Sequence, residues 1–103
     1  DETDWHAILA RYDELPSTPF VALNRAIALG LADGPQAGLA ALERLAASGT
    51  LEGYHLLPAA RADLSRRDGR FADAAAFYRA AVELAPTEPE RRYLRRRLGE
   101  LGG

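Results

Sequence analysis

The most suggestive side chains of this sequence are hydrogen-bonding and cationic groups on expected helices. Asn24 and Arg25 are neighbours in one such helix, and Arg61 holds the equivalent place in a later segment. An amide and a guanidinium on a helix surface can hold a peptide backbone or a carboxylate. They can equally serve the fold, with Asn24 capping a neighbouring helix and Arg25 pairing with a nearby acid. We take all three as candidate partner-binding residues and keep the structural role as the alternative.

Three aromatic or imidazole side chains are further candidates for partner binding. His55 can act as a pH-sensitive contact, or it can be a packed histidine beside two leucines. Tyr54 can stack on Pro58 or on a preceding helix. Trp5, the single tryptophan, can anchor a partner or fasten its own helix to the rest of the chain. Two isolated histidines without cysteine predict no metal site.

The last expected helix is amphipathic and carries a basic outer face. Its leucines Leu94, Leu98 and Leu101 share one side of the helix. The opposite side gathers the candidate basic face, Arg91, Arg92, Arg95 and Arg96. Such a face can meet an acidic protein surface or DNA phosphates, or it can be a solvated helix face.

Catalytic constellations are not found in the sequence. The serines Ser17, Ser48 and Ser65 have no plausible base beside them. The glycines do not form a phosphate-binding loop, because no expected strand precedes them. We therefore predict that the chain is not an enzyme and binds no cofactor.

Composition narrows the class of protein further. Of the 103 residues, 48% are hydrophobic, mostly Ala and Leu, and only 8% are aromatic, which favours close-packed helices over a β-sandwich. A net charge of −2 excludes a chain that binds polyanions as a whole. The absence of cysteine excludes disulfides, cysteine-ligated metals and thiol catalysis. All 13 basic residues are arginine, which suits carboxylate or phosphate recognition but is also what a GC-rich genome produces.

Targeting and membrane signals are not apparent. No apolar stretch approaches the ~20 residues of a membrane span, and no signal peptide is visible. We expect a cytoplasmic protein with no membrane partner. Because the first residue is Asp1 rather than methionine, we also expect a piece of a longer chain.

Periodicity and breaking residues predict an all-α chain of about six helices. Thr3 or Asp4 is positioned to cap the first helix, and Thr87 begins a capping-box pattern before the last. Pro58 lies inside the fourth segment, so that helix either kinks or begins at Pro58 after a short turn through Tyr54. The expected helices cover residues 3–15, 19–31, 35–47, 51–67, 71–85 and 88–99 or 88–102.

The helices form two related pairs at an offset of about 35 residues, close to the length of a tetratricopeptide repeat. The block Leu23-Asn24-Arg25-Ala26 resembles Ala59-Ala60-Arg61-Ala62, and Ala32-Asp33-Gly34 resembles Arg67-Asp68-Gly69.

The second pair is the better match to that repeat. We expect Gly69 to make the turn between its helices. Ala74 and Ala81 would let the helices approach closely. Phe71 and Tyr78 would fill the groove between adjacent pairs.

We predict a single tetratricopeptide-like domain over residues 1–103. A flanking helix (1–16) precedes pair one (19–50) and pair two (51–86), and a capping helix (87–103) follows. Two pairs are fewer than a stable stack usually needs, so the flanking helices would cover its open faces.

Several blocks together carry a resemblance to a known family. They are Asp4 to Asp13, Pro19 to Ala28, Gly34-Pro35 with Gly38-Leu39, Tyr54 to Ala62, and Glu90 to Leu94 with Arg97-Leu98. In this order the chain resembles the C-terminal tetratricopeptide-like extension of bacterial extracytoplasmic-function sigma factors. The resemblance covers nearly the whole chain.

The resemblance implies a regulatory protein-interaction domain involved in transcription initiation. Its partners would be the protein's own N-terminal sigma regions and RNA polymerase. DNA would be contacted only through those sigma regions, upstream of Asp1. Two alternatives stay open, a sensor of a small ligand or peptide and a freestanding helical-repeat scaffold. The sequence leaves the oligomeric state open.

Overall fold

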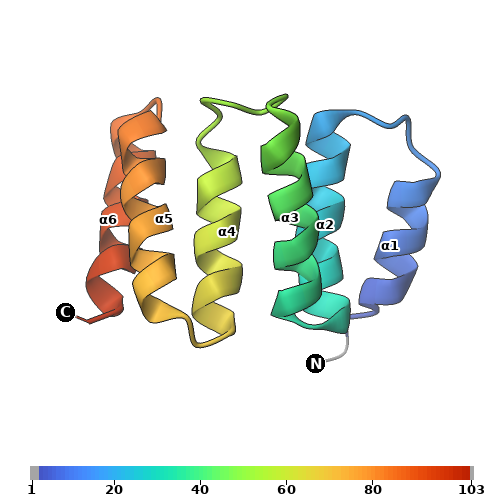
Figure 1. Cartoon of the computed structure of the whole chain (residues 1–103), viewed down its shortest axis with the longest axis horizontal. Helices are drawn as coiled ribbons and strands as arrows, with labels where there is room; N and C mark the ends of the chain where they lie inside the picture. The colour runs from blue at the N-terminus through green and yellow to red at the C-terminus, as the bar shows by residue number, and fades with distance from the viewer. Residues whose placement is uncertain (1–2, 103) are drawn as a thin grey trace. The chain divides into compact units, whose positions relative to one another are not determined.

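The structure is a computed structural model that describes residues 3–102. Those residues form six α-helices and no β-strand, with repeat-like packing, so the all-α prediction is confirmed. The helices are α1 (Trp5–Asp13), α2 (Pro19–Asp33), α3 (Pro35–Ser48), α4 (Leu56–Arg67), α5 (Phe71–Leu84) and α6 (Glu88–Glu100) (Figure 1).

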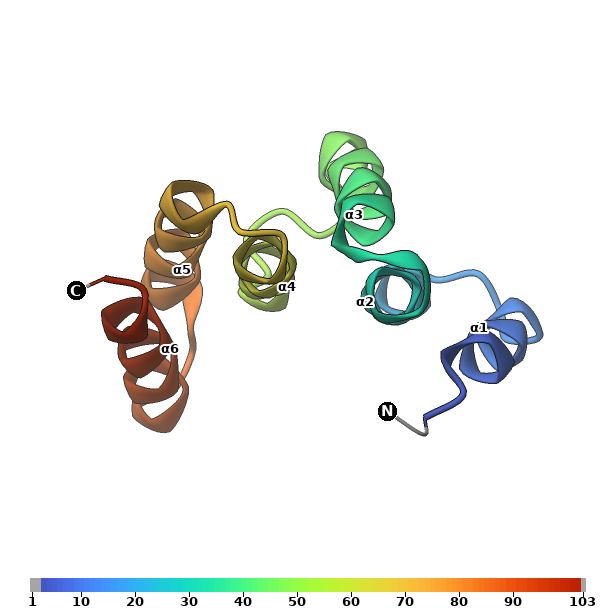
Figure 2. The ribbon, with the colours of Figure 1, turned by 90° about the horizontal axis from the view of Figure 1, so that it is seen from below.

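The chain divides into two compact units, and each is described by itself. Unit 1 covers residues 1–51 and unit 2 covers residues 52–103. In unit 1, α1 packs on α2 and α2 on α3; in unit 2, α4 packs on α5 and α5 on α6. Figure 2 shows α5 and α6 lying side by side. The boundary falls one residue beyond the predicted boundary between the two helix pairs.

Capping side chains set the starts of the first two helices. The Asp4 carboxylate accepts a hydrogen bond from the Ala7 amide at 3.1 Å. Thr18 Oγ1 accepts one from the Val21 amide at 3.1 Å, and Pro19 takes the first helical position. Each cap satisfies an amide that the helix itself leaves unpaired.

Glycines with positive φ separate the helices of unit 1. α2 continues to Asp33, two residues past the predicted end, because the backbone turns only at Gly34, where φ is 105°. α3 ends in the same way at Gly49, with φ of 75°. L-residues rarely adopt such angles, so glycine fixes both breaks.

Pro58 does not kink α4. The helix begins at Leu56, which places Pro58 in its first turn. Amides of the first turn have no acceptor within the helix, so the missing N–H of proline costs no helical hydrogen bond there. Of the two predicted alternatives, the short turn through Tyr54 is correct, with a start two residues before Pro58.

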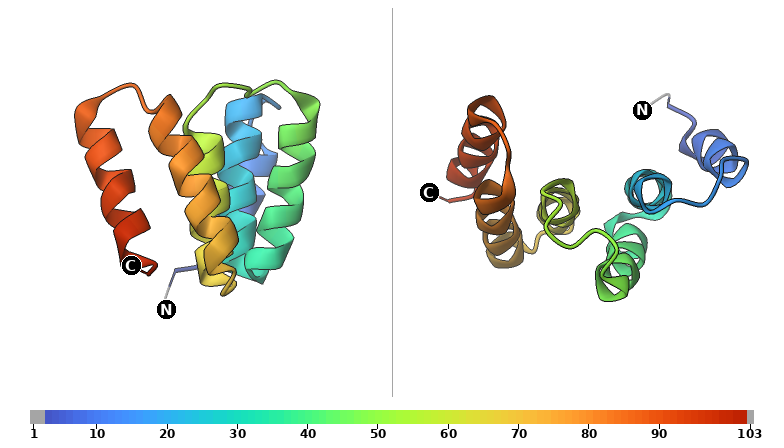
Figure 3. Two further views of the ribbon diagram at one scale, coloured as in Figure 1. Left: turned by 60° about the vertical axis from the view of Figure 1, so that its left-hand side comes forward. Right: turned by 90° about the horizontal axis from the view of Figure 1, so that it is seen from above.

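A Schellman turn joins α4 to α5 (Figure 3). The Arg70 amide donates to the Ser65 carbonyl at 2.8 Å, and the Gly69 amide donates to the Arg66 carbonyl at 3.1 Å. Gly69 has φ of 78°, which this motif requires. The predicted role of Gly69 is confirmed.

Small residues line the centre of unit 2. Ala62, Ala74 and Ala81 are completely buried, Tyr78 is 2% exposed and Leu94 is 3% exposed. The alanines let α4 and α5 lie close together, and the Tyr78 ring fills the remaining space. Leu98 and Leu101 of α6 pack against this cluster, as the amphipathic pattern predicts.

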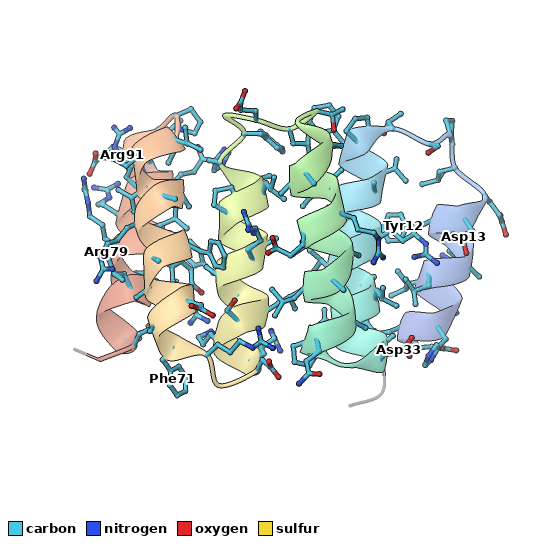
Figure 4. The ribbon with its side chains drawn as sticks, viewed as in Figure 1. Tyr12, Asp13, Asp33, Phe71, Arg79 and Arg91 are labelled. Atoms are coloured by element: carbon cyan, nitrogen blue, oxygen red, sulfur yellow. The ribbon has the colours of Figure 1, made fainter. Side chains whose placement is uncertain are left out.

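The prediction for Phe71 is wrong, because its side chain does not fill a groove in unit 2. It is 55% exposed and extends from the lower end of α5 (Figure 4). Phe71 is the first residue of α5, and side chains tilt toward the N-terminus of a helix. Its ring therefore passes beyond the packed part of α5 and borders a hollow of about 400 Å³ beside Leu98 and Leu101.

Candidate functional site

Arg25 is held by an acid from the neighbouring helix. Its Nε donates to Asp13 Oδ1 at 2.7 Å, and its Nη2 donates to Oδ2 at 3.5 Å. This pair joins the end of α1 to α2, so the structural role considered for Arg25 is present. Asn24 is exposed, and its side chain forms no hydrogen bond within residues 3–102. It caps no helix there and presents an uncommitted amide to solvent.

A shallow hollow of about 330 Å³ lies between α2 and α3 of unit 1. Arg25 and Arg44 line its wall together with three alanines, Leu45 and Ser48. Asn24 lies outside this hollow. The structure therefore does not bring Asn24 and Arg25 into one site.

Trp5 belongs to the packed stripe of α1. It is half-buried together with Ile8 and Tyr12, while Leu9 is buried. The adjacent His6 points elsewhere, with its Nε2 2.8 Å from Asp33 Oδ1. The half-buried Trp5 thus shares one side of α1 with Leu9, four residues further along.

Arg61 is half-buried on α4 and lies over an aromatic ring. Its guanidinium carbon is 4.3 Å from the centroid of the Phe77 ring on α5. This cation–π contact uses one face of the guanidinium plane. Arg61 and Arg25 occupy equivalent repeat positions, yet one contacts an aromatic ring and the other a carboxylate.

His55 is the centre of the most developed polar contact of unit 2. It precedes α4, is 8% exposed, and packs edge-to-face on Tyr54 with 5.5 Å between ring centroids. Its Nε2 lies 2.7 Å from Glu90 Oε2 on α6. At this distance the two groups form an ion pair when the imidazole ring is protonated. The angle between them does not meet the geometry of a hydrogen bond. His55 is thus both packed against Tyr54 and paired with a carboxylate.

Glu90 is also tied to its own helix cap. Thr87 Oγ1 donates to Glu90 Oε1 at 2.6 Å and accepts from the Glu90 amide at 3.3 Å. The Thr87 hydrogen bond, aided by His55, lowers the pKa of Glu90 below its ordinary value. The carboxylate is therefore kept ionised beside His55.

An apolar pocket of about 270 Å³ opens beside this pair. Leu56 and Ala59 of α4 form one wall, and Pro89, Tyr93 and Leu94 of α6 form the other; His55 and Glu90 supply its polar edge. Leu56 is 42% exposed and Tyr93 is 52% exposed. Two large apolar side chains thus stand at an open hollow, which we call the α4–α6 pocket.

The arginines of the predicted basic face differ in what they contact. Arg91 is half-buried and donates to Glu88 Oε1 at 3.1 Å and to the Ala85 carbonyl at 2.9 Å, so it serves the α5–α6 turn. Arg95 lies 3.5 Å from Glu88.

Two arginines stay available on α6. Arg96 lies over the Tyr93 ring, with 5.9 Å between the guanidinium carbon and the ring centroid. Arg92 is exposed and forms no ion pair in the described part of the chain. The uncommitted part of the predicted face is therefore Arg92 and Arg96.

A second charge cluster links α4 to α6 below the pocket. Asp63 receives hydrogen bonds from Arg66 Nη2 at 2.6 Å and Arg67 Nε at 3.0 Å, and Arg97 Nη2 lies 3.9 Å away. Burial alone would raise the pKa of Asp63, but the hydrogen bonds from Arg66 and Arg67 outweigh it and lower that pKa. The hydrogen bond to Asp63, aided by Tyr78, raises the pKa of Arg66, and Tyr78 raises the pKa of Arg97. This cluster holds the helices of unit 2 together.

The structure thus brings His55 together with Tyr54 and Glu90, and it brings Arg96 together with Tyr93. Some residues of this site were missed from the sequence. The missed ones are Glu90, Tyr93 and Leu56, which complete the pocket around His55. Tyr93 follows Pro89 by four residues and therefore lies on the same side of α6, and that spacing is the one sequence signal for it. The contact of His55 with Glu90 spans two helices and has no sequence signal.

Metal-binding clusters and membrane spans are not found among residues 3–102. No three His, Asp or Glu side chains gather there in a way that could hold a metal ion. No helix in the same range has the length and apolar character needed to cross a bilayer.

Comparison with known proteins identifies a bacterial relative. An uncharacterized protein of Rhizobium meliloti is 35% identical over 104 aligned positions, which cover 98% of this chain and 24% of that protein. The chain therefore spans about a quarter of the length of the curated relative it matches. No protein-family model matches the chain, and no solved structure matches it significantly.

Proposed function

We propose that this chain is a regulatory protein-interaction domain of a bacterial extracytoplasmic-function sigma factor. It acts in the cytoplasm by docking onto the sigma regions of its own polypeptide or onto RNA polymerase. The observation that carries docking is the α4–α6 pocket, where Leu56 and Tyr93 expose apolar surface beside an arginine-bearing helix. Exposed apolar surface with a polar rim is characteristic of protein-binding sites. The sequence blocks that resemble the sigma-factor extension supply the choice of partner.

A retention experiment tests this function. The chain is immobilised, and purified sigma regions and core RNA polymerase from the same source are passed over it. We expect retention, and we expect Asn24→Ala to weaken it several-fold if the α2 surface takes part, since that amide has no structural task. Gln36→Ala, an exposed amide on α3, is the matched control. Failure to retain either partner contradicts the sigma-factor proposal, and unchanged retention by Asn24→Ala removes the α2 surface from it.

A second candidate, a small-ligand sensor, is favoured by the size of the same pocket. Its 270 Å³ approaches the ~300 Å³ at which small-molecule sites begin. A ligand that binds the folded state raises the melting temperature. A thermal-shift screen with small apolar carboxylates and amides tests this, and no shift near saturation removes the sensor.

A further inference from the structure

The α4–α6 pocket is apolar inside and lies between two helices of net positive charge. Helix α6 contains five arginines and three glutamates, a net +2, within a chain of net charge −2. The remaining residues therefore carry a net −4. Helix α4 also has a net +2, from three arginines and one aspartate, so a partner with negative charge is attracted to both helices that line the pocket.

The available cations lie next to the pocket mouth. Arg96 lies over the ring of Tyr93, which lines the pocket. Arg92 precedes Arg96 by one helical turn, so their side chains emerge on the same side of α6. Neither forms an ion pair within the described residues. Both guanidiniums can therefore take a carboxylate from outside the chain.

The acidic edge of the pocket is already engaged in contacts within the chain. Glu90 receives the Thr87 hydroxyl at 2.6 Å and lies 2.7 Å from His55 Nε2. Each carboxylate oxygen of Glu90 therefore already has a contact within the chain. Neither Arg92 nor Arg96 is among the contacts of Glu90, so both guanidiniums stay available to an incoming carboxylate.

We propose that the α4–α6 pocket binds an acidic segment of a partner protein that carries an apolar anchor. A leucine or phenylalanine side chain of that segment enters between Leu56 and Tyr93, and flanking carboxylates contact Arg92 and Arg96. This inference rests on the proposed docking function and names the chemistry that the docked surface must present.

Binding of matched synthetic peptides to the purified chain tests the proposal. The probe is a fluorescein-labelled peptide with a Leu-Phe pair between runs of glutamate, and its binding is followed by fluorescence anisotropy. One comparison peptide has glutamine in place of glutamate, and another has serine in place of Leu-Phe. We expect both to bind at least about tenfold more weakly, and we expect the affinity of the acidic peptide to fall with added salt.

Variants of the chain locate the binding site. Tyr93→Ser and the double variant Arg92→Gln/Arg96→Gln should each weaken the acidic peptide about tenfold. Arg11→Gln is the matched control, because Arg11 is exposed on α1 and has no ion pair in the described range. Circular dichroism verifies that each variant keeps its helix content. Amide NMR shifts caused by the peptide should concentrate in the start of α4 and in α6.

Several outcomes overturn the proposal. They are no binding of the acidic peptide, equal binding of the glutamine peptide, or binding unaffected by the pocket variants. Self-association that is seen in sedimentation and abolished by Tyr93→Ser would assign the pocket to a second copy of the chain instead.

If the sigma regions or polymerase are retained equally by wild type and by the pocket variants, this inference fails while the docking function stands. If the peptide binds at the pocket and neither sigma regions nor polymerase is retained, the sigma-factor assignment fails and the acidic-segment site stands.

Discussion

His55 Nε2 lies 2.7 Å from Glu90 Oε2 and thereby joins the residue before α4 to the first turn of α6. The imidazole is almost fully buried, whereas the carboxylate side chain is 40% exposed. Glu90 keeps its place through Thr87, whose hydroxyl group bonds both its carboxylate and its amide. One threonine thus positions the acid that faces the buried histidine.

Thr87→Ala should therefore change both a pKa and the stability of unit 2. Loss of the cap costs about 1 kcal/mol of unfolding free energy. Loss of the main hydrogen bond that lowers the pKa of Glu90 should raise that pKa toward its ordinary value. A carboxyl whose pKa is lowered by folding stabilises above its unfolded-state pKa, and this stabilisation is lost as the pH falls through the folded-state pKa. Carboxyl NMR titration and urea unfolding measure the two effects, and an unchanged Glu90 titration would contradict the assignment.

Asp63→Asn should destabilise the chain near neutral pH and have little effect in acid. Two arginines hydrogen-bond Asp63, and the side chain is 35% exposed, so solvent screening limits the loss to about 1 kcal/mol. Because its pKa is lowered in the folded state, the contribution is present above the unfolded-state pKa and disappears between about pH 5 and pH 2. Urea unfolding of both proteins across this range is the measurement. A difference that persists at the acid end would show that Asp63 acts through packing rather than charge.

Gly69→Ala and Gly99→Ala should shift stability in opposite directions. Gly69 has φ of 78°, and a side chain in this conformation costs about 1 kcal/mol. Gly99 lies within α6, and no neighbouring atom comes within 4 Å of the place that an alanine methyl group would take. Alanine there should therefore add up to about 1 kcal/mol through helix propensity. Thermal unfolding of the two variants gives the comparison, and equal effects would contradict the Schellman turn.

Ala81→Leu should destabilise unit 2 through overpacking. Ala81 is completely buried beside Ala62 and Ala74, where added methyl groups force α4 and α5 apart at a cost of about 1–3 kcal/mol. Ala80→Leu, at the exposed neighbouring position of the same helix, is the control and should be nearly neutral. Urea unfolding decides, and tolerance of leucine at position 81 would mean that α4 and α5 are not in close contact.

Arg25→Ala should cost more stability than Asn24→Ala. Arg25 loses its contacts with Asp13, which are worth up to about 1 kcal/mol at this exposure. Asn24 is exposed and makes no side-chain hydrogen bond among residues 3–102, so its replacement should stay within about 0.5 kcal/mol. The two unfolding midpoints test this. A larger loss at Asn24 would reveal a structural role for its amide.

Most of the fold prediction rests on helix-capping residues and on a turn glycine. Asp4 and Thr87 cap helices where the sequence places them, and Gly69 turns the chain as its position requires. Such signals depend on residues a few positions apart, so one sequence contains them. Phe71 shows where such local signals fail. Its exposure depends on where α5 begins relative to the neighbouring helices rather than on its hydrophobicity.

The candidate site was less accessible from sequence, since its members come from separate helices. His55 and Arg96 were recognised, but Leu56, Glu90 and Tyr93 join them only through the packing of α4, α5 and α6. A single sequence reports periodicity within a helix and does not report which helices meet. For the same reason, the sequence does not predict that Arg25 pairs with Asp13 or that Arg61 lies over the Phe77 ring.

Trp5 lies on α1 and is the single tryptophan of the chain. Unit 2 therefore contains no indole and has only tyrosine and phenylalanine as chromophores. Selective excitation of the indole follows unit 1 alone, whereas far-ultraviolet circular dichroism follows the helices of both units. The placement of one residue thus provides an intrinsic optical label that separates the two halves without any chemical modification.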